Sequence, residues 1–146
     1  MAAIENTELP FLTLSFRRDL DVLFCRWHTF VSTSEFCEGY WSALQLAEQY
    51  NARFWLHDLR LRNNSTEAER YWYDREFVPA AGQQLPFSLT IAYLMSPMQR
   101  QHIISETSLV SEVINYGDLL QIRHFISEHH ALAWLQECRM RTIPLH

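Results

Sequence analysis

Apolar and polar residues alternate from residue 11 to residue 17, with Leu12, Leu14 and Phe16 on one side of an extended chain. Such alternation predicts a half-buried strand, because successive side chains of a strand point to opposite faces. The extended pattern resumes over residues 22–30 after a short polar turn. We therefore expect the two runs to form an antiparallel hairpin.

Apolar residues then recur at helical spacing over residues 33–50. Ser32 with Glu35 three positions later has the spacing of a capping box, which marks the start of this helix. An apolar strand at 53–59 and a polar turn at 60–64 follow it.

A second helix is indicated by Asn64 and Glu67, which again have the spacing of a cap. It is predicted to extend to about Val78, because Pro79 lacks the N–H that would continue it. Residues 80–86 are then expected to form a loop.

The rest of the chain predicts two more strands, each followed by a helix. The expected elements are a strand at 87–95, a helix at 99–116, a strand at 119–126 and, after a cap at Ser127, a helix at 128–138.

This order, β-β-α-β-α-β-α-β-α, predicts an α/β fold with a mostly parallel five-stranded sheet and an antiparallel first strand. It gives one domain at 11–138, with a polar N-terminal lead at 1–10 and a C-terminal tail at 139–146. Each strand has one polar-leaning side, so the helices are expected mainly on one face of the sheet. The other face would be open and would carry Phe24, Trp55, His57 and Phe125.

Composition narrows the classes of partner. The 146 residues have a net charge of -5 and no basic run, so nucleic acid is not an expected partner. The sequence has no apolar run of membrane-spanning length and does not start like a signal peptide, so we expect a cytoplasmic protein with no membrane partner. The three cysteines form no CxxC pair and the three glycines form no phosphate loop, so no metal and no cofactor are expected.

Polar side chains crowd the turn after the central strand, beside the start of the second helix. At the end of a parallel strand this arrangement favours a site for an anion or a protein partner. The alternative is that the same groups make ordinary turn and helix-cap bonds. The residues concerned are Asp58, Arg60, Arg62, Asn64, Ser65 and Thr66.

His57 and Asp58 are adjacent on a strand, so they point to opposite faces and cannot form a catalytic dyad. We expect no catalytic residues from this pair, and His57 is interpreted as a surface or interface residue.

Tyr71, Trp72 and Tyr73 follow one another in the second predicted helix, so they cannot all face the core. Together with the rings of the open face they would leave an apolar patch that a second copy of the chain could cover. We therefore expect a homodimer, with the interface formed from Phe24, Trp55, His57, Tyr71, Trp72, Tyr73 and Phe125.

The element order, the strand Phe-Trp-Leu-His-Asp-Leu-Arg with Asp58 near its end, and the closing Ser-Glu-His-His-Ala-Leu-Ala-Trp-Leu at 127–135 resemble the STAS-like (SpoIIAA-like) fold. This is the fold of anti-sigma-factor antagonists and of the cytoplasmic domains of sulfate transporters. The resemblance spans residues 11–138 and is stronger to the small stand-alone bacterial proteins of that superfamily.

In the antagonists, a serine at the start of the helix after the central strand is phosphorylated by a partner kinase. The resemblance implies that Asp58 matches the aspartate at the strand end, and that Ser65 or Thr66 lies near the switch serine. Ser65 is thus the implied phosphosite. Asn64 stands where the antagonists have an acidic residue, and the small glycine after the serine is absent.

The expected function is that of a non-enzymatic protein-interaction or regulatory module. One alternative is a carrier of a small apolar ligand in a pocket between sheet and helices, which should show an enclosed cavity. The other is an unrecognised enzyme, which should show polar groups converging at the turn after Leu59.

Overall fold

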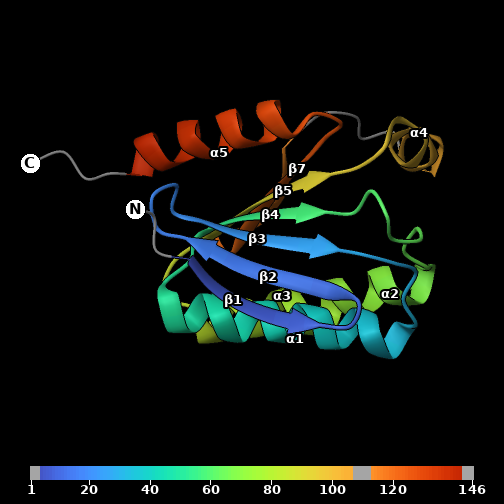
Figure 1. The fold of residues 1–146 in the computed structure, drawn as a ribbon, viewed down its shortest axis with the longest axis horizontal. Coiled ribbons are helices and arrows are strands. Elements are labelled where there is room, and N and C mark those ends of the chain that lie inside the picture. Colours follow the sequence, from blue (N-terminus) through green and yellow to red (C-terminus); the bar gives the residue numbers. More distant parts are fainter. Residues whose placement is uncertain (1–3, 107–112, 143–146) are drawn as a thin grey trace, which may run out of the picture.

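The computed structural model describes residues 4–106 and 113–142, which form a seven-stranded sheet with helices on both faces (Figure 1). The four strands β3, β4, β5 and β7 run parallel to one another. β2 and β6 are antiparallel to the strands they flank, and β1 is antiparallel to β2. The order across the sheet is β1 (Ile4–Leu9), β2 (Leu12–Arg17), β3 (Val22–Trp27), β4 (Phe54–Asp58), β5 (Leu89–Leu94), β7 (Leu120–Phe125) and β6 (Ile114–Tyr116).

The predicted α/β fold is present, and its five predicted strands are the central ones. The edge strands β1 and β6 were not predicted, so the expectation of a polar lead at 1–10 is wrong where β1 forms. Asn6, Thr7 and Glu8 of β1 are all exposed, because the strand borders solvent. Such a strand gives no apolar alternation, and its pairing with β2 rests on backbone hydrogen bonds.

Helix α1 has the predicted bounds, Thr33–Tyr50, and both bonds of the Ser32–Glu35 capping box are made. Helix α4 starts at Pro97 and ends at Glu106, whereas residues 114–116 of the predicted helix form β6. The part of that predicted helix at 107–112 lies outside the described residues. Helix α5 runs from Glu128 to Thr142, beyond the predicted start of the tail.

The second predicted helix differs in both its cap and its end. Its cap is Thr66 with Glu69, not Asn64 with Glu67, and these two residues exchange bonds of 2.9 and 3.1 Å. The helix passes Pro79 as three successive segments, so the predicted loop at 80–86 is wrong. These segments are α2 (Glu67–Trp72), a π-helical turn η1 (Tyr73–Phe77) and α3 (Val78–Gln84).

The π-helical turn explains why the proline does not end the helix. The N–H of Val78 bonds to the carbonyl of Tyr73, five residues back. Pro79 follows at the first turn of α3, where a missing N–H costs little. The same turn buries both Tyr73 and Phe77.

Most helices lie on one face, as predicted, but the other face is not open. Helices α1 and α3 and the turn η1 cover a large aromatic core, and α5 covers a second core that includes Phe24 and Phe125 (Figure 1). Trp55 and His57 lie on the α1 side, so the predicted division between the faces is wrong. Both sides of β4 are buried, and the indole N–H of Trp55 and Nδ1 of His57 have hydrogen-bond partners inside the protein.

Candidate functional site

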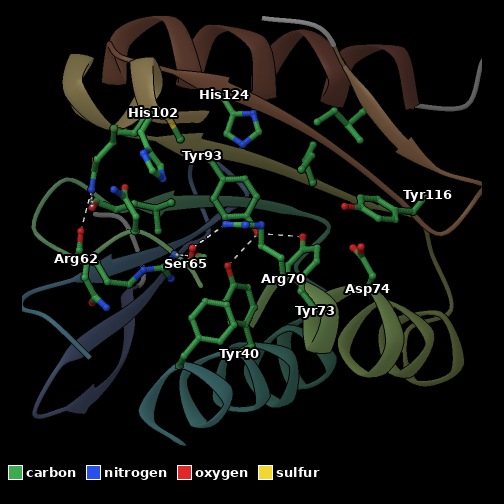
Figure 2. A pocket seen from close by; sticks show the side chains of 18 residues that line it. Tyr40, Arg62, Ser65, Arg70, Tyr73, Asp74, Tyr93, His102, Tyr116 and His124 are labelled. Carbon is green, nitrogen blue, oxygen red and sulfur yellow. Dashed lines mark hydrogen bonds between the residues drawn. The ribbon is translucent and has the colours of Figure 1, made fainter. Parts of the chain in front are cut away.

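A cavity of about 320 Å³ opens at the carboxyl ends of β4, β5 and β7, on the α1 face of the sheet (Figure 2). Ligand sites of α/β proteins commonly form at this edge of a parallel sheet. The lining is mostly aromatic and aliphatic, with a few polar groups. The lining residues are Phe36, Tyr40, Leu59, Arg62, Asn63, Asn64, Ser65, Arg70, Tyr73, Asp74, Tyr93, Met95, Gln99, His102, Ile114, Tyr116, Ile122 and His124.

Arg62 is the most unusual lining residue, because its charged side chain is only 5% exposed. The guanidinium lies over the rings of Trp27 and Phe36, at 4.7 and 5.0 Å from their centroids. Its Nη2 donates to Oγ of Ser65 at 3.0 Å. Its Nη1 is buried and has no hydrogen-bond partner among the described residues.

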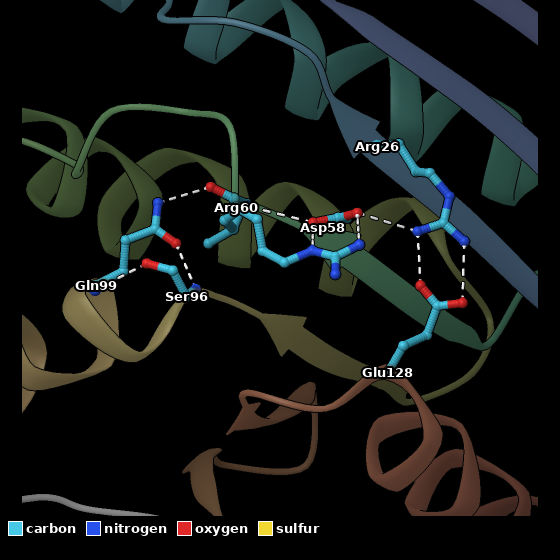
Figure 3. Close-up of polar contacts among 7 residues, drawn as sticks. Arg26, Asp58, Arg60, Ser96, Gln99 and Glu128 are labelled. Atoms are coloured by element: carbon cyan, nitrogen blue, oxygen red, sulfur yellow. Dashed lines mark hydrogen bonds and ion pairs between the residues drawn. The ribbon is translucent and has the colours of Figure 1, made fainter.

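The turn that carries Arg62 is held in place by Gln99 of α4. The side-chain Nε2 of Gln99 donates to the carbonyls of Leu59 and Arg62, at 2.7 and 2.8 Å. Its Oε1 accepts from the backbone N–H of Ser96 at 2.8 Å (Figure 3). On the other side of the turn, Asn63 accepts from the N–H of Val31. Arg62 is thus positioned by contacts distant in sequence.

Three phenols form a hydrogen-bonded chain along one wall of the cavity. The hydroxyls of Tyr40 and Tyr93 are 3.1 Å apart, and Tyr93 donates to Tyr73 at 3.0 Å. Burial raises the pKa of all three, and for Tyr40 the charge of Arg62 acts in the opposite direction. The three hydroxyls are therefore protonated at neutral pH.

The remaining titratable residues of the lining are Arg70, Asp74, His102, Tyr116 and His124. Burial, together with the charge of Arg100, lowers the pKa of His124 to about 4, so its imidazole is neutral at pH 7. Burial and the carboxylate of Asp74 raise the pKa of Tyr116. Among the described lining residues Asp74 is the acidic one. Figure 2 shows Arg62 and Ser65 on one side of the cavity, and Tyr73, Asp74 and Tyr116 on the other.

A more open hollow adjoins the cavity on the side of α4. The two share five lining residues, and the exposed side chains of Phe30 and Met98 border the outer one. The shared residues are Arg62, Asn63, Asn64, Gln99 and His102.

Asp58 and Arg60 belong to a separate cluster of charges (Figure 3). Asp58 accepts from Nε and Nη2 of Arg60, both at 2.9 Å, and from Nη1 of Arg26 at 3.1 Å. Arg26 also forms two bonds to the carboxylate of Glu128 at the start of α5. Burial raises the pKa of Asp58, but its bonds from Arg60 and Arg26 outweigh this, and the net pKa is lowered. The two cations are balanced by two anions, so this cluster has no excess positive charge to bind an anion.

The residues predicted around the turn therefore separate into three groups. Arg62, Asn64 and Ser65 line the cavity, whereas Asp58 and Arg60 form the charge cluster. Thr66 caps α2 through its side-chain oxygen. Both interpretations of the turn hold in part, because capping and ion-pair bonds occupy some of its polar groups and the cavity borders the others.

The interpretation of His57 as a surface residue is wrong, since its side chain is fully buried. Its Nδ1 accepts from the indole N–H of Trp27 at 3.1 Å, and its ring stacks on Tyr40 with a centroid separation of 5.0 Å. Burial and the charge of Arg62 hold the pKa of His57 well below its ordinary value.

The expected exposed aromatic patch is also wrong in most of its members. Trp72 is partly buried against Trp41 and Phe36, whereas Tyr71 is 61% exposed, with the guanidinium of Arg75 over its ring. The rings buried within the chain's own core are Phe24, Trp55, His57, Tyr73 and Phe125.

The sequence analysis did not place Tyr40, Tyr93, Tyr116 and His124 together in one cavity. They come from α1, β5, β6 and β7, and nothing in their local sequence links them. One usable signal was that Tyr93 and His124 each place a polar atom on a buried strand near its carboxyl end, where ligand sites concentrate.

Two further observations concern the described residues alone. In residues 4–106 and 113–142, no group of three His, Cys, Asp or Glu side chains is arranged to hold a metal ion. Over the same residues, no helix combines the length and the apolar character needed to cross a lipid bilayer.

No protein-family model and no curated protein matches the sequence. Among solved structures, the chain is similar to the crystal structure of an uncharacterised protein of the DUF3478 family from Shewanella loihica PV-4. The two are 15% identical with a TM-score of 0.45, over 92% of this chain and 93% of the other. That structure is described as having a SpoIIAA-like fold.

Proposed function

We propose that this domain is a non-enzymatic ligand-binding module, and that its cavity binds a small organic anion through Arg62. The observation that carries the proposal is the buried Nη1 of Arg62, which has no partner among the described residues. A buried cation is normally paired, because removing an ion from water costs several kcal/mol. An anionic ligand in the cavity that Arg62 lines would balance this buried charge.

The walls of the cavity support an organic ligand rather than an inorganic ion. Phe36, Tyr93, Met95 and Ile122 present apolar surface in the same cavity as Arg62. The volume of about 320 Å³ is near the lower end of the range for small-molecule sites. A monocarboxylate with a compact apolar body matches both the charge and the space.

The negative net charge of the chain strengthens the argument that Arg62 has a specific role. The protein carries a charge of -5, so a buried cation beside an apolar cavity is not part of a general basic surface. A regulatory role would then be exerted through occupancy of the cavity, with the ligand biasing the turn between β4 and α2.

Isothermal titration calorimetry with 4-isopropylbenzoate and its uncharged amide tests this function, with phenylacetate and 3-phenylpropanoate homologues to vary the length. The acids should bind the wild-type protein at least about ten-fold more tightly than the amides, because a charged hydrogen bond contributes about 1.5–3 kcal/mol. Arg62→Met should abolish this preference.

Arg75→Met is the matched control, since it removes a guanidinium that lies over the Tyr71 ring and does not line the cavity. It should leave acid binding unchanged. If no acid binds the wild type, or if Arg62→Met binds the acids as well as the wild type does, the proposed function is wrong.

A further inference from the structure

The chain of tyrosine hydroxyls leaves one proton without an acceptor, and this limits the chemistry of the ligand. Three hydroxyls carry three protons, and the two bonds between them use two. Tyr93 donates its single hydroxyl proton to Tyr73, so Tyr40 must donate to Tyr93. The proton of Tyr73 is the one left over.

The charge of Arg62 favours the same direction. A guanidinium has donors and no acceptor, so the oxygen of the nearby Tyr40 hydroxyl turns toward it and the proton turns away. The influence of Arg62 on Tyr40 is visible in the pKa of that phenol, which the guanidinium charge lowers against the effect of burial. A chain that starts beside Arg62 thus ends with a donor at Tyr73.

This leftover proton belongs to a residue that lines the cavity. Tyr73 is 8% exposed and lines the cavity on the side away from Arg62 (Figure 2). Burial is the main cause of the raised pKa of Tyr73, the charge of Asp74 contributes less, and no hydrogen bond joins these two side chains among the described contacts. The cavity therefore presents the guanidinium of Arg62 on one side and the neutral hydroxyl of Tyr73 on the other, and Arg70 also lines it.

We infer that the ligand is a bifunctional organic acid, with a carboxylate for Arg62 and an uncharged hydrogen-bond acceptor, such as a carbonyl, for Tyr73. This inference rests on the proposed function, because it assumes that an acid occupies the cavity. The rings of Phe36, Tyr40 and Tyr93 also line the cavity, and they suit a planar, unsaturated body.

The test compares 4-acetylbenzoate with 4-isopropylbenzoate, which have the same shape and charge and differ by a carbonyl oxygen in place of a methyl group. The homologous phenylacetates and phenylpropanoates extend both series in length. In a cavity without a donor the isopropyl acid binds more tightly, because a carbonyl loses its bonds to water. With Tyr73 as donor, the acetyl acid of the best-fitting length should bind about five-fold more tightly.

Tyr73→Phe should reverse or abolish this preference, whereas the matched surface variant Tyr71→Phe should retain it. The ratio of the affinities of the wild-type protein for the acetyl and isopropyl acids needs no variant, so the inference stays testable if Tyr73→Phe fails to fold. An acetyl preference that is absent in the wild type, or unchanged in Tyr73→Phe, overturns the inference and leaves the Arg62-dependent binding of acids intact. If no acid of either series binds, the proposed function fails, and the inference fails with it.

Discussion

The indole N–H of Trp27 donates to Nδ1 of His57 at 3.1 Å, inside the core between α1 and the sheet. The neutral imidazole therefore carries its proton on Nε2, which is buried and has no acceptor among the described residues. Burial first, and the charge of Arg62 second, hold the pKa of His57 well below 6.5. The structure thus requires an uncharged ring at this position.

This requirement predicts a loss of stability in mild acid. Below the ordinary histidine pKa the unfolded chain binds a proton at His57 that the folded chain does not, so the free energy of unfolding falls as pH decreases. His124 acts in the same direction until its folded-state pKa of about 4 is reached. Each ring can contribute a slope of up to about 1.4 kcal/mol per pH unit.

Urea unfolding between pH 7.5 and pH 5 measures this slope. His124→Gln should reduce it, and exposed His130→Gln is the control that should leave it unchanged. A wild-type free energy of unfolding that stays constant over this range would show that neither ring is held neutral.

Arg62→Met should leave the ligand-free protein at least as stable as the wild type. The substitution removes a buried charge that lacks a full set of partners, and the methionine side chain can pack on Trp27 and Phe36. The lost cation–π contacts offset this gain by about 1–2 kcal/mol. Urea unfolding without ligand is the measurement, and a loss above about 3 kcal/mol would mean that Arg62 is required for folding rather than for binding.

Asp58→Asn should destabilise the protein by about 1–3 kcal/mol, because two guanidinium groups lose a shared carboxylate whose side chain is 11% exposed, although at 36% and 48% exposure they stay partly hydrated. Glu128→Gln removes the outer partner of Arg26, whose carboxylate is 37% exposed, and should cost less than about 1 kcal/mol. Thermal or urea unfolding of the two variants compares them directly. Equal losses would show that the cluster is not organised around Asp58.

Gly39→Ala and Gly82→Ala form a matched pair of helical substitutions. A Cβ at residue 39 would overlap the buried ring of Trp27, whereas one at residue 82 would meet the end of the exposed Leu119 side chain at 2.7 Å. Alanine gains about 1 kcal/mol of helix propensity at either site. Overpacking in Gly39→Ala should nevertheless lower the free energy of unfolding by about 1–3 kcal/mol, whereas Gly82→Ala should leave it unchanged or raise it slightly.

Denaturation monitored by tryptophan fluorescence reads both variants of this pair. A stabilising Gly39→Ala would show that the indole of Trp27 has room to move.

Local signals explain which parts of the fold the sequence predicted. Ser32 and Glu35 form their cap with neighbours three residues apart, so the start of α1 could be read from the pattern alone. The end of the next helix could not, because it depends on how η1 packs Tyr73 and Phe77 against the sheet. The cap at Thr66 and Glu69 was missed for a simpler reason, since Asn64 and Glu67 have the same spacing two residues earlier.

The site was less predictable than the fold because its bonds join distant residues. Arg62 stood out in the sequence as part of a polar turn, but its burial depends on Trp27 and Phe36. His57 was predicted to be exposed because it is polar. It is buried, where its ring accepts the hydrogen bond of the Trp27 indole. Tyr73 and Tyr93 are 20 residues apart, and only the folded sheet brings their hydroxyls together.

Gln99 makes the conformation of the Arg62 turn depend on α4, and the sequence of the turn does not reveal this dependence. A single carboxamide joins the start of α4 to two carbonyls of the arginine-bearing turn, 40 and 37 residues earlier in the chain. The segment at 59–66 would therefore not keep its conformation in another scaffold, because it would lose the hydrogen bonds from Gln99. A displacement of α4 from the sheet would therefore also move the turn that positions Arg62, because one side chain couples the two segments.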